Sequence, residues 1–289
     1  MIKEPQPDDA HAISRRSVQD GQHDIVVRDQ SDELATVLIV DDNDDMRRYL
    51  RTLLLNRYYV LEASDGQSGW KLARESVPDL IISDVMMPVM DGLTFCGKIK
   101  TEPLTSHIPV ILLTARSTEQ QQAEGLSQGA DAYLTKPFSA EVLLAHIASL
   151  LANRQKLKKV FSAEKQQTNE NQEQEEKLST PDKMFMDTLR QAILRNMSNT
   201  KLKMDDLGAD MGISRVQLYR KVKAMTGMSP VELLKEMRLK RAMKLLKATD
   251  KTVAEVAYEV GFGTPGYFSS CFKKQYGKYP TDIKEDAKE

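Results

Sequence analysis

Short apolar runs recur along the first half of the chain, and each one is followed by polar residues. They occupy residues 37–40, 81–82, 110–113 and 132–134. Stretches with helical periodicity separate them, so the pattern predicts buried strands of a parallel sheet that alternate with helices. In sheets of this kind, functional residues gather at the carboxyl ends of the strands.

Acidic residues come directly after two of these runs. Asp41 and Asp42 follow the first run, and Asp84 closely follows the second. Two like charges about 4 Å apart repel by roughly 1 kcal/mol in water and roughly 4 kcal/mol at an effective dielectric constant near 20. A hard divalent cation bound through oxygen removes this repulsion, which favours a Mg²⁺ site.

The other two runs bring a hydroxyl and an ammonium group to the same edge, because Thr114 follows the third run and Lys136 the fourth. A carboxylate nucleophile, a metal ion, a hydroxyl and a lysine are typical of a phosphoryl-transfer site. Asp44, Asp45 and Asp91 precede helical patterns, where helix caps and the helix dipole favour acids. We therefore interpret these three as capping residues.

The separated motifs, in this order, resemble the receiver domain of two-component response regulators over roughly residues 35 to 153. The resemblance implies an α/β fold, a doubly wound parallel (βα)5 sheet of the flavodoxin type. It also implies that Asp84 accepts a phosphoryl group from a histidine kinase. By the same resemblance, the ligands of Mg²⁺ are Asp41, Asp42, Asp84 and the backbone carbonyl of Met86.

The resemblance assigns roles to three further side chains. Lys136 holds a phosphoryl oxygen, Thr114 turns toward the phosphate after transfer, and Tyr133 changes rotamer with it. The alternative for Tyr133 is a core residue that fills a gap. The bond between Lys136 and Pro137 is a candidate cis peptide, since X-Pro is the common setting for cis.

Length and composition indicate a protein of at least two domains, because 289 residues exceed one typical core. No apolar run approaches 18 residues, and the amino terminus lacks the basic start and apolar stretch of a signal peptide. Cys96 and Cys271 lie in predicted helices of different domains, which argues against a disulfide framework or a zinc site. We expect a cytoplasmic protein without membrane insertion.

The overall charge of −1 conceals an uneven distribution along the chain. Residues 1 to 34 carry a net charge of −4, residues 35 to 152 carry −5, residues 153 to 182 are balanced, and residues 183 to 289 carry +8. We predict a disordered tail (1–34), a receiver domain (35–152), a flexible linker rich in Gln, Glu and Lys (153–182) and a DNA-binding domain (183–289).

The last hundred residues contain a repeat that appears when the numbering is shifted by 50. Each copy has a hydroxyl helix cap, apolar residues at the fourth and eighth following positions, and a terminal glycine. The aligned sets are Ser214, Leu218, Val222, Gly227 and Pro230, and Thr264, Phe268, Phe272, Gly277 and Pro280. Another helix and a glycine, Gly212 or Gly261, precede each copy. The pattern predicts an all-α domain with two helix-turn-helix motifs.

The second copy, residues 255–280, resembles the signature of AraC-type DNA-binding domains, and the resemblance extends over about residues 184 to 286. It implies that one long helix joins two modules whose second helices face successive major grooves, about 34 Å apart. The expected DNA-contacting residues are Arg215, Val216, Gln217, Tyr219, Arg220, Lys221, Gly266, Ser269, Ser270 and Lys273.

Within this set, we expect Arg220 to pair with guanine, and Arg215 and Lys221 to contact phosphates. The alternative for Arg220 and Lys221 is an ordinary solvated helix face. The short side chains of Ser269 and Ser270 offer little hydrogen-bonding reach, so the second module is expected to recognise DNA largely through backbone contacts and DNA shape.

These features favour a phosphorylation-controlled transcription regulator. Phosphorylation would shift the population toward a homodimer through residues 139–151, and the dimer would bind promoter DNA more tightly. RNA polymerase is a further partner that this role admits. We expect no enzyme activity beyond slow autodephosphorylation, because an aspartate-nucleophile phosphatase needs an acid where Met86 stands. A second alternative is the C-terminal part of a hybrid sensor histidine kinase, which has this domain order.

Overall fold

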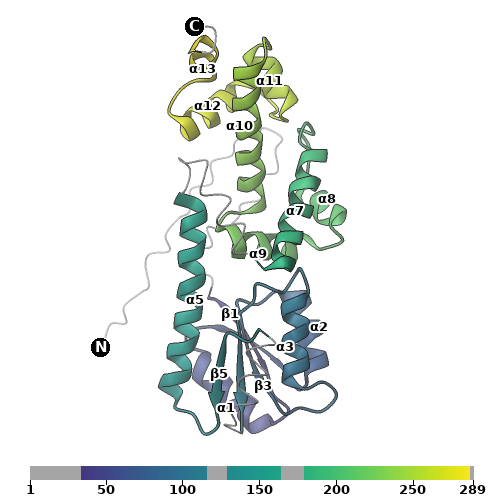
Figure 1. Cartoon of the computed structure of the whole chain (residues 1–289), viewed down its shortest axis with the longest axis vertical. Helices are drawn as coiled ribbons and strands as arrows, with labels where there is room; N and C mark the ends of the chain where they lie inside the picture. The colour runs from purple at the N-terminus through teal and green to yellow at the C-terminus, as the bar shows by residue number, and fades with distance from the viewer. Residues whose placement is uncertain (1–33, 116–128, 164–178, 287–289) are drawn as a thin grey trace, which may run out of the picture. The chain divides into compact units, whose positions relative to one another are not determined.

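The computed structural model describes residues 34–115, 129–163 and 179–286 (Figure 1). The predictions for nearly all of the amino-terminal tail, and for the middle of the linker, fall outside these residues. No helix in the described part of the chain is both long and apolar enough to cross a membrane.

The first half forms a parallel five-stranded sheet with the strand order β2-β1-β3-β4-β5. Its strands are β1 (Thr36–Val40), β2 (Tyr59–Ala63), β3 (Leu80–Asp84), β4 (Val110–Thr114) and β5 (Ala132–Thr135). The direction of winding reverses at β1, as in doubly wound folds. The flavodoxin-like topology predicted from the sequence is therefore confirmed.

Helices cover both faces of this sheet (Figure 1). On one face lie α1 (Asp44–Leu54) and α5 (Ala140–Ala163), and on the other lie α2 (Gly66–Ser76) and α3 (Gly92–Thr101). Successive residues of β1 alternate between the two cores: Leu38 packs with the α2–α3 side, whereas Ile39 packs with the α1–α5 side. This alternation is the period of two that a strand imposes on its side chains.

The helix starts confirm the capping interpretation for Asp91 but not for Asp44 and Asp45. The side chain of Asp91 caps α3 by accepting from the backbone N–H of Thr94 at 2.8 Å. Asp44 and Asp45 occupy the first turn of α1, where negative charges interact favourably with the helix dipole. The capping residue of α1 is Asn43.

The second half is entirely helical within the described residues and contains two helix-turn-helix motifs, α8–α9 and α11–α12. Its helices are α7 (Thr180–Arg195), α8 (Met204–Asp210), α9 (Arg215–Thr226), α10 (Pro230–Ala248), α11 (Val253–Glu259), α12 (Pro265–Tyr276) and α13 (Pro280–Asp286). Ser214 and Thr264 cap α9 and α12, and both helices end at a left-handed glycine. The predicted repeat is thus confirmed as a structural one.

The two helix-turn-helix modules have separate apolar cores, and α10 contributes to both. Leu234 belongs to the core of the first module, with residues of α7, α8 and α9. Leu239, Ala242 and Leu246 belong to the core of the second, with residues of α11 and α12. The long helix therefore joins the modules, as the resemblance implied.

The predicted linker, residues 153 to 182, includes residues at both ends that belong to helices. Helix α5 continues to Ala163, and α7 begins at Thr180, so both ends of the proposed linker are helical. The Lys- and Gln-rich residues after Leu151 are good helix formers. At the other end, Ser179 caps α7 and Pro181 lies in its first turn, a typical helix start that we had assigned to the linker.

Candidate functional site

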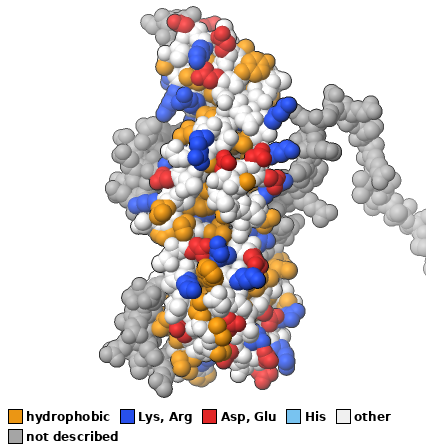
Figure 2. Space-filling view, turned by 90° about the vertical axis from the view of Figure 1, so that its right-hand side faces the viewer, with side chains coloured by type: hydrophobic (Ala, Val, Ile, Leu, Met, Phe, Trp, Pro, Cys, Tyr) orange, Lys and Arg blue, Asp and Glu red, His pale blue; other side chains and the backbone are white. Residues whose placement is uncertain are grey.

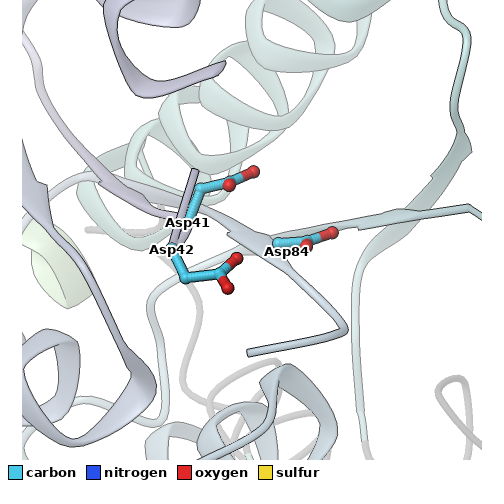
Figure 3. Close-up of side chains that lie close together, drawn as sticks. All are labelled: Asp41, Asp42 and Asp84. Atoms are coloured by element: carbon cyan, nitrogen blue, oxygen red, sulfur yellow. The ribbon is translucent and has the colours of Figure 1, made fainter. Parts of the chain in front are cut away.

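Three carboxylates meet at the carboxyl edge of the sheet. Asp41 and Asp42 follow β1, Asp84 is the last residue of β3, and these two strands are hydrogen-bonded neighbours. Carboxylate oxygens of all three residues lie within 4.8 Å of one another. Figure 3 shows their side chains extending in the same direction from the two strand ends. The structure thus brings together the acidic residues that the sequence predicted.

Lys136 adds one ammonium group to this cluster. Its Nζ lies 3.0 Å from Asp41 Oδ2 and 3.0 Å from Asp84 Oδ1. A backbone hydrogen bond holds the lysine in place, since its N–H donates to the carbonyl of Thr114 at 2.7 Å. The bond between Lys136 and Pro137 is cis. The expected cis peptide is therefore present.

Burial and charge act in opposite directions on the ionisation of this pair. Desolvation raises the pKa of Asp84 above its ordinary value, and Lys136 offsets only part of that effect. For Lys136, desolvation favours a lower pKa, but the hydrogen bonds and charges of Asp84 and Asp41 raise it overall. Both pKa values are thus raised, so Asp84 and Lys136 each hold their proton more firmly than an exposed side chain of the same type.

The donor set fits a divalent cation. Three carboxylates face one ammonium group, so the cluster of these four side chains carries an excess of negative charge when ionised. Hard oxygen donors of this kind suit Mg²⁺. Asp41 is 1% exposed, whereas Asp42 is exposed, so the cluster opens to solvent on one side. That the backbone carbonyl of Met86 also binds the metal stays a prediction.

The two expected switch residues lie on neighbouring strands. Thr114 is buried at the end of β4, and Tyr133 is partly buried in β5 and packs against the core on the α2–α3 side. Their positions are compatible with the roles that the resemblance gives them. Movement of either side chain stays a prediction.

Gly92 is a residue of this site that sequence reasoning missed. A Cβ atom at this position would lie 2.0 Å from the carbonyl oxygen of Asp84, too close for any side chain. The backbone N–H of Gly92 also donates to the carbonyl of Val85 at 2.9 Å. The start of α3 therefore packs directly on the backbone of Asp84. A glycine directly after the capping Asp91 was the signal available in the sequence.

The expected DNA-contacting residues of α9 differ in exposure. Arg215 and Val216 are exposed, and Tyr219 is half-buried. Arg215 also lies 3.7 Å from a carboxylate oxygen of Asp205. Gln217 has a structural function, because its side chain accepts from the backbone N–H of Ser214 at 2.7 Å in a capping box.

Two of these side chains also donate to backbone carbonyls of the first half of the chain. Gln217 Nε2 donates to the carbonyl of Arg74 at 2.8 Å, and Arg220 donates to that of Ser76. DNA that recruited these side chains would have to replace both contacts.

The expectation that Lys221 contacts a DNA phosphate is not met. Its side chain is fully buried and forms an ion pair with Asp182 of α7, and Asp182 also accepts from the hydroxyl of Ser106 at 2.6 Å. Burial alone would raise the pKa of Asp182, but the charge and hydrogen bond of Lys221 lower it. The sequence placed Asp182 in the linker, so this partner could not be anticipated.

In the second module, α12 presents small residues to solvent. Gly266, Ser270 and Lys273 are exposed and Ser269 is half-buried. Ser270 Oγ donates to the carbonyl of Gly266 at 3.1 Å, and the ammonium of Lys273 lies 4.0 Å from the centre of the Tyr279 ring. This surface has the short reach that the sequence indicated.

On the face of the molecule shown in Figure 2, charge alone does not locate a nucleic-acid surface. On the face shown in Figure 2, Lys and Arg side chains are interspersed with acidic and apolar ones and form no single large patch. The helix-turn-helix geometry, rather than a basic patch, therefore carries the assignment of the DNA-binding region.

Comparison with protein families supports both halves of this description. Residues 37–148 match the family model of the response regulator receiver domain, and residues 207–286 match that of a helix-turn-helix domain. Both matched ranges lie within the domains expected from the sequence, 35–152 and 183–289.

Several curated relatives share one or both halves. "Histidine kinase P4" of Formosa agariphila is 40% identical over 249 residues, which are 86% of this chain but 18% of the relative. "Response regulator PleD" of Caulobacter vibrioides is 44% identical over 117 residues, 40% of this chain and 26% of the relative. The "DNA-binding dual master transcriptional regulator RpaA" of Synechocystis sp. is 40% identical over 116 residues, 40% of this chain and 48% of the relative. The chain thus spans less than half of each of these relatives.

Solved structures resemble the first half. The signal receiver domain of a signal transduction histidine kinase from Syntrophus aciditrophicus is 37% identical, covers 41% of this chain and 91% of its own, and has a TM-score of 0.40. The chemotaxis response regulator CheY4 of Vibrio cholerae is 34% identical, covers 40% of this chain and 98% of its own, and has a TM-score of 0.39.

The raised pKa of Asp84 predicts that Asp84→Asn stabilises the metal-free receiver domain. A raised folded-state pKa means that the protein loses stability as the pH rises from the unfolded value of about 3.9 through the folded value, so the penalty is present above both values. We expect the variant to have a higher Tm than the wild type in EDTA, at a pH above the folded-state pKa. Mg²⁺ should stabilise the wild type more than the variant. Asp44→Asn is the control, and a lower Tm for Asp84→Asn contradicts the prediction.

The buried ion pair predicts that Lys221→Met destabilises the protein by about 3 to 5 kcal/mol at pH 7, because Asp182 is left buried and unpaired. Urea unfolding followed by circular dichroism measures this change. The pKa of Asp182 is lowered, so the stabilisation by the pair is present above about pH 3.9 and is lost as the pH falls through the folded value.

The half-exposed Lys223 provides a matched control, and Lys223→Met should cost little stability. The double variant Lys221→Met, Asp182→Leu should recover most of the loss. If Lys221→Met behaved like Lys223→Met, the buried pair would have no part in stability.

Proposed function

We propose that this chain, in which a response regulator receiver domain (residues 37–148) is followed by a helix-turn-helix domain (residues 207–286), regulates transcription under the control of phosphorylation at Asp84. The observation that carries the proposal is the position of the Asp84 carboxylate. It ends β3 beside two further carboxylates and lies 3.0 Å from the ammonium of Lys136.

This geometry suits an acceptor of a phosphoryl group. An oxygen of Asp84 attacks the phosphorus of a phosphohistidine in the kinase, the P–N bond breaks, and the imidazole leaves with a proton from solvent. A Mg²⁺ ion held by Asp41, Asp42 and Asp84 would neutralise charge on the phosphoryl oxygens. Lys136, already paired with Asp84, is placed to bind one of these oxygens.

The change in charge at Asp84 offers a physical basis for control. The acyl phosphate competes for the ammonium of Lys136 and for the hydroxyl of Thr114, which lies at the end of the adjacent strand. Such a shift would be passed through Tyr133 on β5 to α5, the helix through which we expect dimerisation. The phosphate then favours one of two populations instead of imposing a new fold.

DNA binding is assigned to the two helix-turn-helix motifs, with α9 and α12 as the helices that enter the grooves. The exposed side chains of Arg215, Val216 and Arg220 on α9, and of Lys273 on α12, support this assignment. A promoter site would then contain two half-sites about one helical turn apart. Binding should weaken as salt rises, because phosphate contacts release counterions.

A second candidate is that this block works as the receiver and output portion of a hybrid sensor histidine kinase. The observation in its favour is the 40% identity to "Histidine kinase P4" across both halves of the chain. An antibody against the helical domain distinguishes the two in extracts of the native organism. A band near the 32.6 kDa mass of this chain supports a separate regulator, and a much larger band supports the hybrid.

An enzyme of the aspartate-nucleophile phosphatase class is a weaker candidate, because Met86 stands where the catalytic acid would be needed. We propose that the protein does not turn over small phosphate esters. Sustained release of phosphate from such esters, lost in Asp84→Asn, would reverse this proposal.

Treatment with a small acyl phosphate donor and Mg²⁺ should add one phosphoryl group to the wild type and none to Asp84→Asn, since the amide is not a nucleophile. Intact-mass spectrometry followed by peptide mapping reads out the modified residue. Asp44→Asn, which removes an exposed carboxylate of α1, should be modified like the wild type. Phosphate found on any residue other than Asp84 refutes the assignment.

On DNA sequences selected by the wild type, Arg220→Ala should reduce discrimination by about 1 to 3 kcal/mol at one base position, as expected for a contact with guanine. Arg215→Ala should weaken binding to all sequences alike and lower the salt slope by about 1, as expected for a phosphate contact. Fluorescence anisotropy at several stated salt concentrations measures both. Equal loss on all sequences for Arg220→Ala would remove its role in base reading.

A further inference from the structure

Two equivalent turns of the repeat differ in their surroundings. Gly212 connects α8 to α9 with a φ of 68°, and Gly261 connects α11 to α12 with a φ of 85°. A Cβ atom on Gly212 would meet nothing within 4 Å. On Gly261, it would lie 2.1 Å from the carbonyl oxygen of Met197. The turn of the second module is therefore packed against the first module.

Met197 belongs to the segment between α7 and α8, and its side chain is buried in the core of the first module. The main chain cannot retreat from Gly261 without disturbing that core. A backbone oxygen is also a harder obstacle than the end of a flexible side chain. The close approach thus fixes the distance between one turn of the second module and one loop of the first.

Arg238 of α10 completes the contact. Its Nη2 donates to the carbonyl of Asn199 at 2.7 Å, in the same α7–α8 segment, and would lie 2.7 Å from a Cβ on Gly261. Arg238 is half-buried, and this burial lowers the pKa of its guanidinium, which is a sign of partial desolvation. It lies on α10 between Leu234 of the first core and Leu239 of the second.

We propose that Met197, Asn199, Arg238 and Gly261 form a lock between the modules that sets the orientation of α12 relative to α9. The lock thereby determines which spacing of half-sites the protein accepts. The part of this inference that concerns DNA rests on the proposed function. Arg238 and Gly261 are positioning residues, since they act on DNA recognition through the placement of α12.

A second attachment is needed because α10 alone leaves freedom between the modules. Their apolar cores are separate, and small changes in the packing of either core on α10 would rotate one recognition helix about the other. Two base pairs inserted between half-sites rotate the second by about 70° around the duplex. A protein with a fixed module orientation must therefore lose affinity on such a site.

The lock can be tested without DNA by measuring a distance between spin labels in the full chain. Labels at Thr188→Cys in α7 and Lys274→Cys in α12 report on the two modules, and both positions are exposed. Cys271 is replaced by serine. Cys96 can stay, because burial raises the pKa of its thiol to about 11 and keeps it unreactive.

Pulsed electron paramagnetic resonance should give one narrow distance distribution for the labelled protein in which the four lock residues are unchanged. Gly261→Ala and Arg238→Met should shift or broaden it. Gly212→Ala is the matched control, since it brings the same left-handed strain without the collision, and should leave the distribution narrow. An unchanged distribution in both Gly261→Ala and Arg238→Met overturns the proposal, provided that circular dichroism shows the variants folded.

Binding to selected DNA then tests the consequence for recognition. Insertion of two base pairs should reduce the affinity of the wild type and of Gly212→Ala about tenfold or more. For Arg238→Met the reduction should be markedly smaller, because a loosened module can follow its half-site. If the wild type bound no DNA, the proposed function would be wrong. The spin-label distances would still show whether the four residues fix the orientation of the modules. If Arg238→Met lost as much affinity as the wild type on the site with two inserted base pairs, the lock would have no role in DNA recognition.

Discussion

Repulsion among three carboxylates at one sheet edge constrains the whole receiver domain. Asp41, Asp42 and Asp84 are drawn together because they follow or end neighbouring parallel strands, so the pairing of β1 with β3 places their backbones side by side. Lys136 partly neutralises the cluster from the end of β5. The remaining negative charge makes the site responsive, because a cation or a phosphoryl group changes its energy by several kcal/mol.

The same constraint explains which parts of the receiver could be predicted from the sequence. Apolar runs followed by Asp84, Thr114 and Lys136 mark strand ends by chemistry as well as by periodicity, so their convergence was predictable. The edge strand β2 is half exposed, and its sequence had no comparable mark. Gly92 was missed because its role depends on a backbone approach between two segments, which leaves no signature in hydrophobicity or charge.

In the helical domain, local patterns were reliable and long-range pairings were not. Capping hydroxyls and terminal glycines located α9 and α12 closely, because they are satisfied within the helix itself. Lys221 was misjudged since its exposure is decided by Asp182, which is distant in sequence and was assigned to a linker. The extent of α5 was underestimated because the composition of a polar helix resembles that of a flexible linker.

The two modules of the repeat are alike in their helices and unlike in the space around their turns. Open surroundings at Gly212 leave the choice of residue there to backbone preference alone, so asparagine or aspartate could replace it at modest cost. At Gly261 the neighbouring main chain excludes every side chain. The sequences of the two copies of a duplicated unit can thus diverge at different rates. Substitutions are sterically tolerated in the turn of the first module, whereas the main chain of the first module excludes them from the turn of the second.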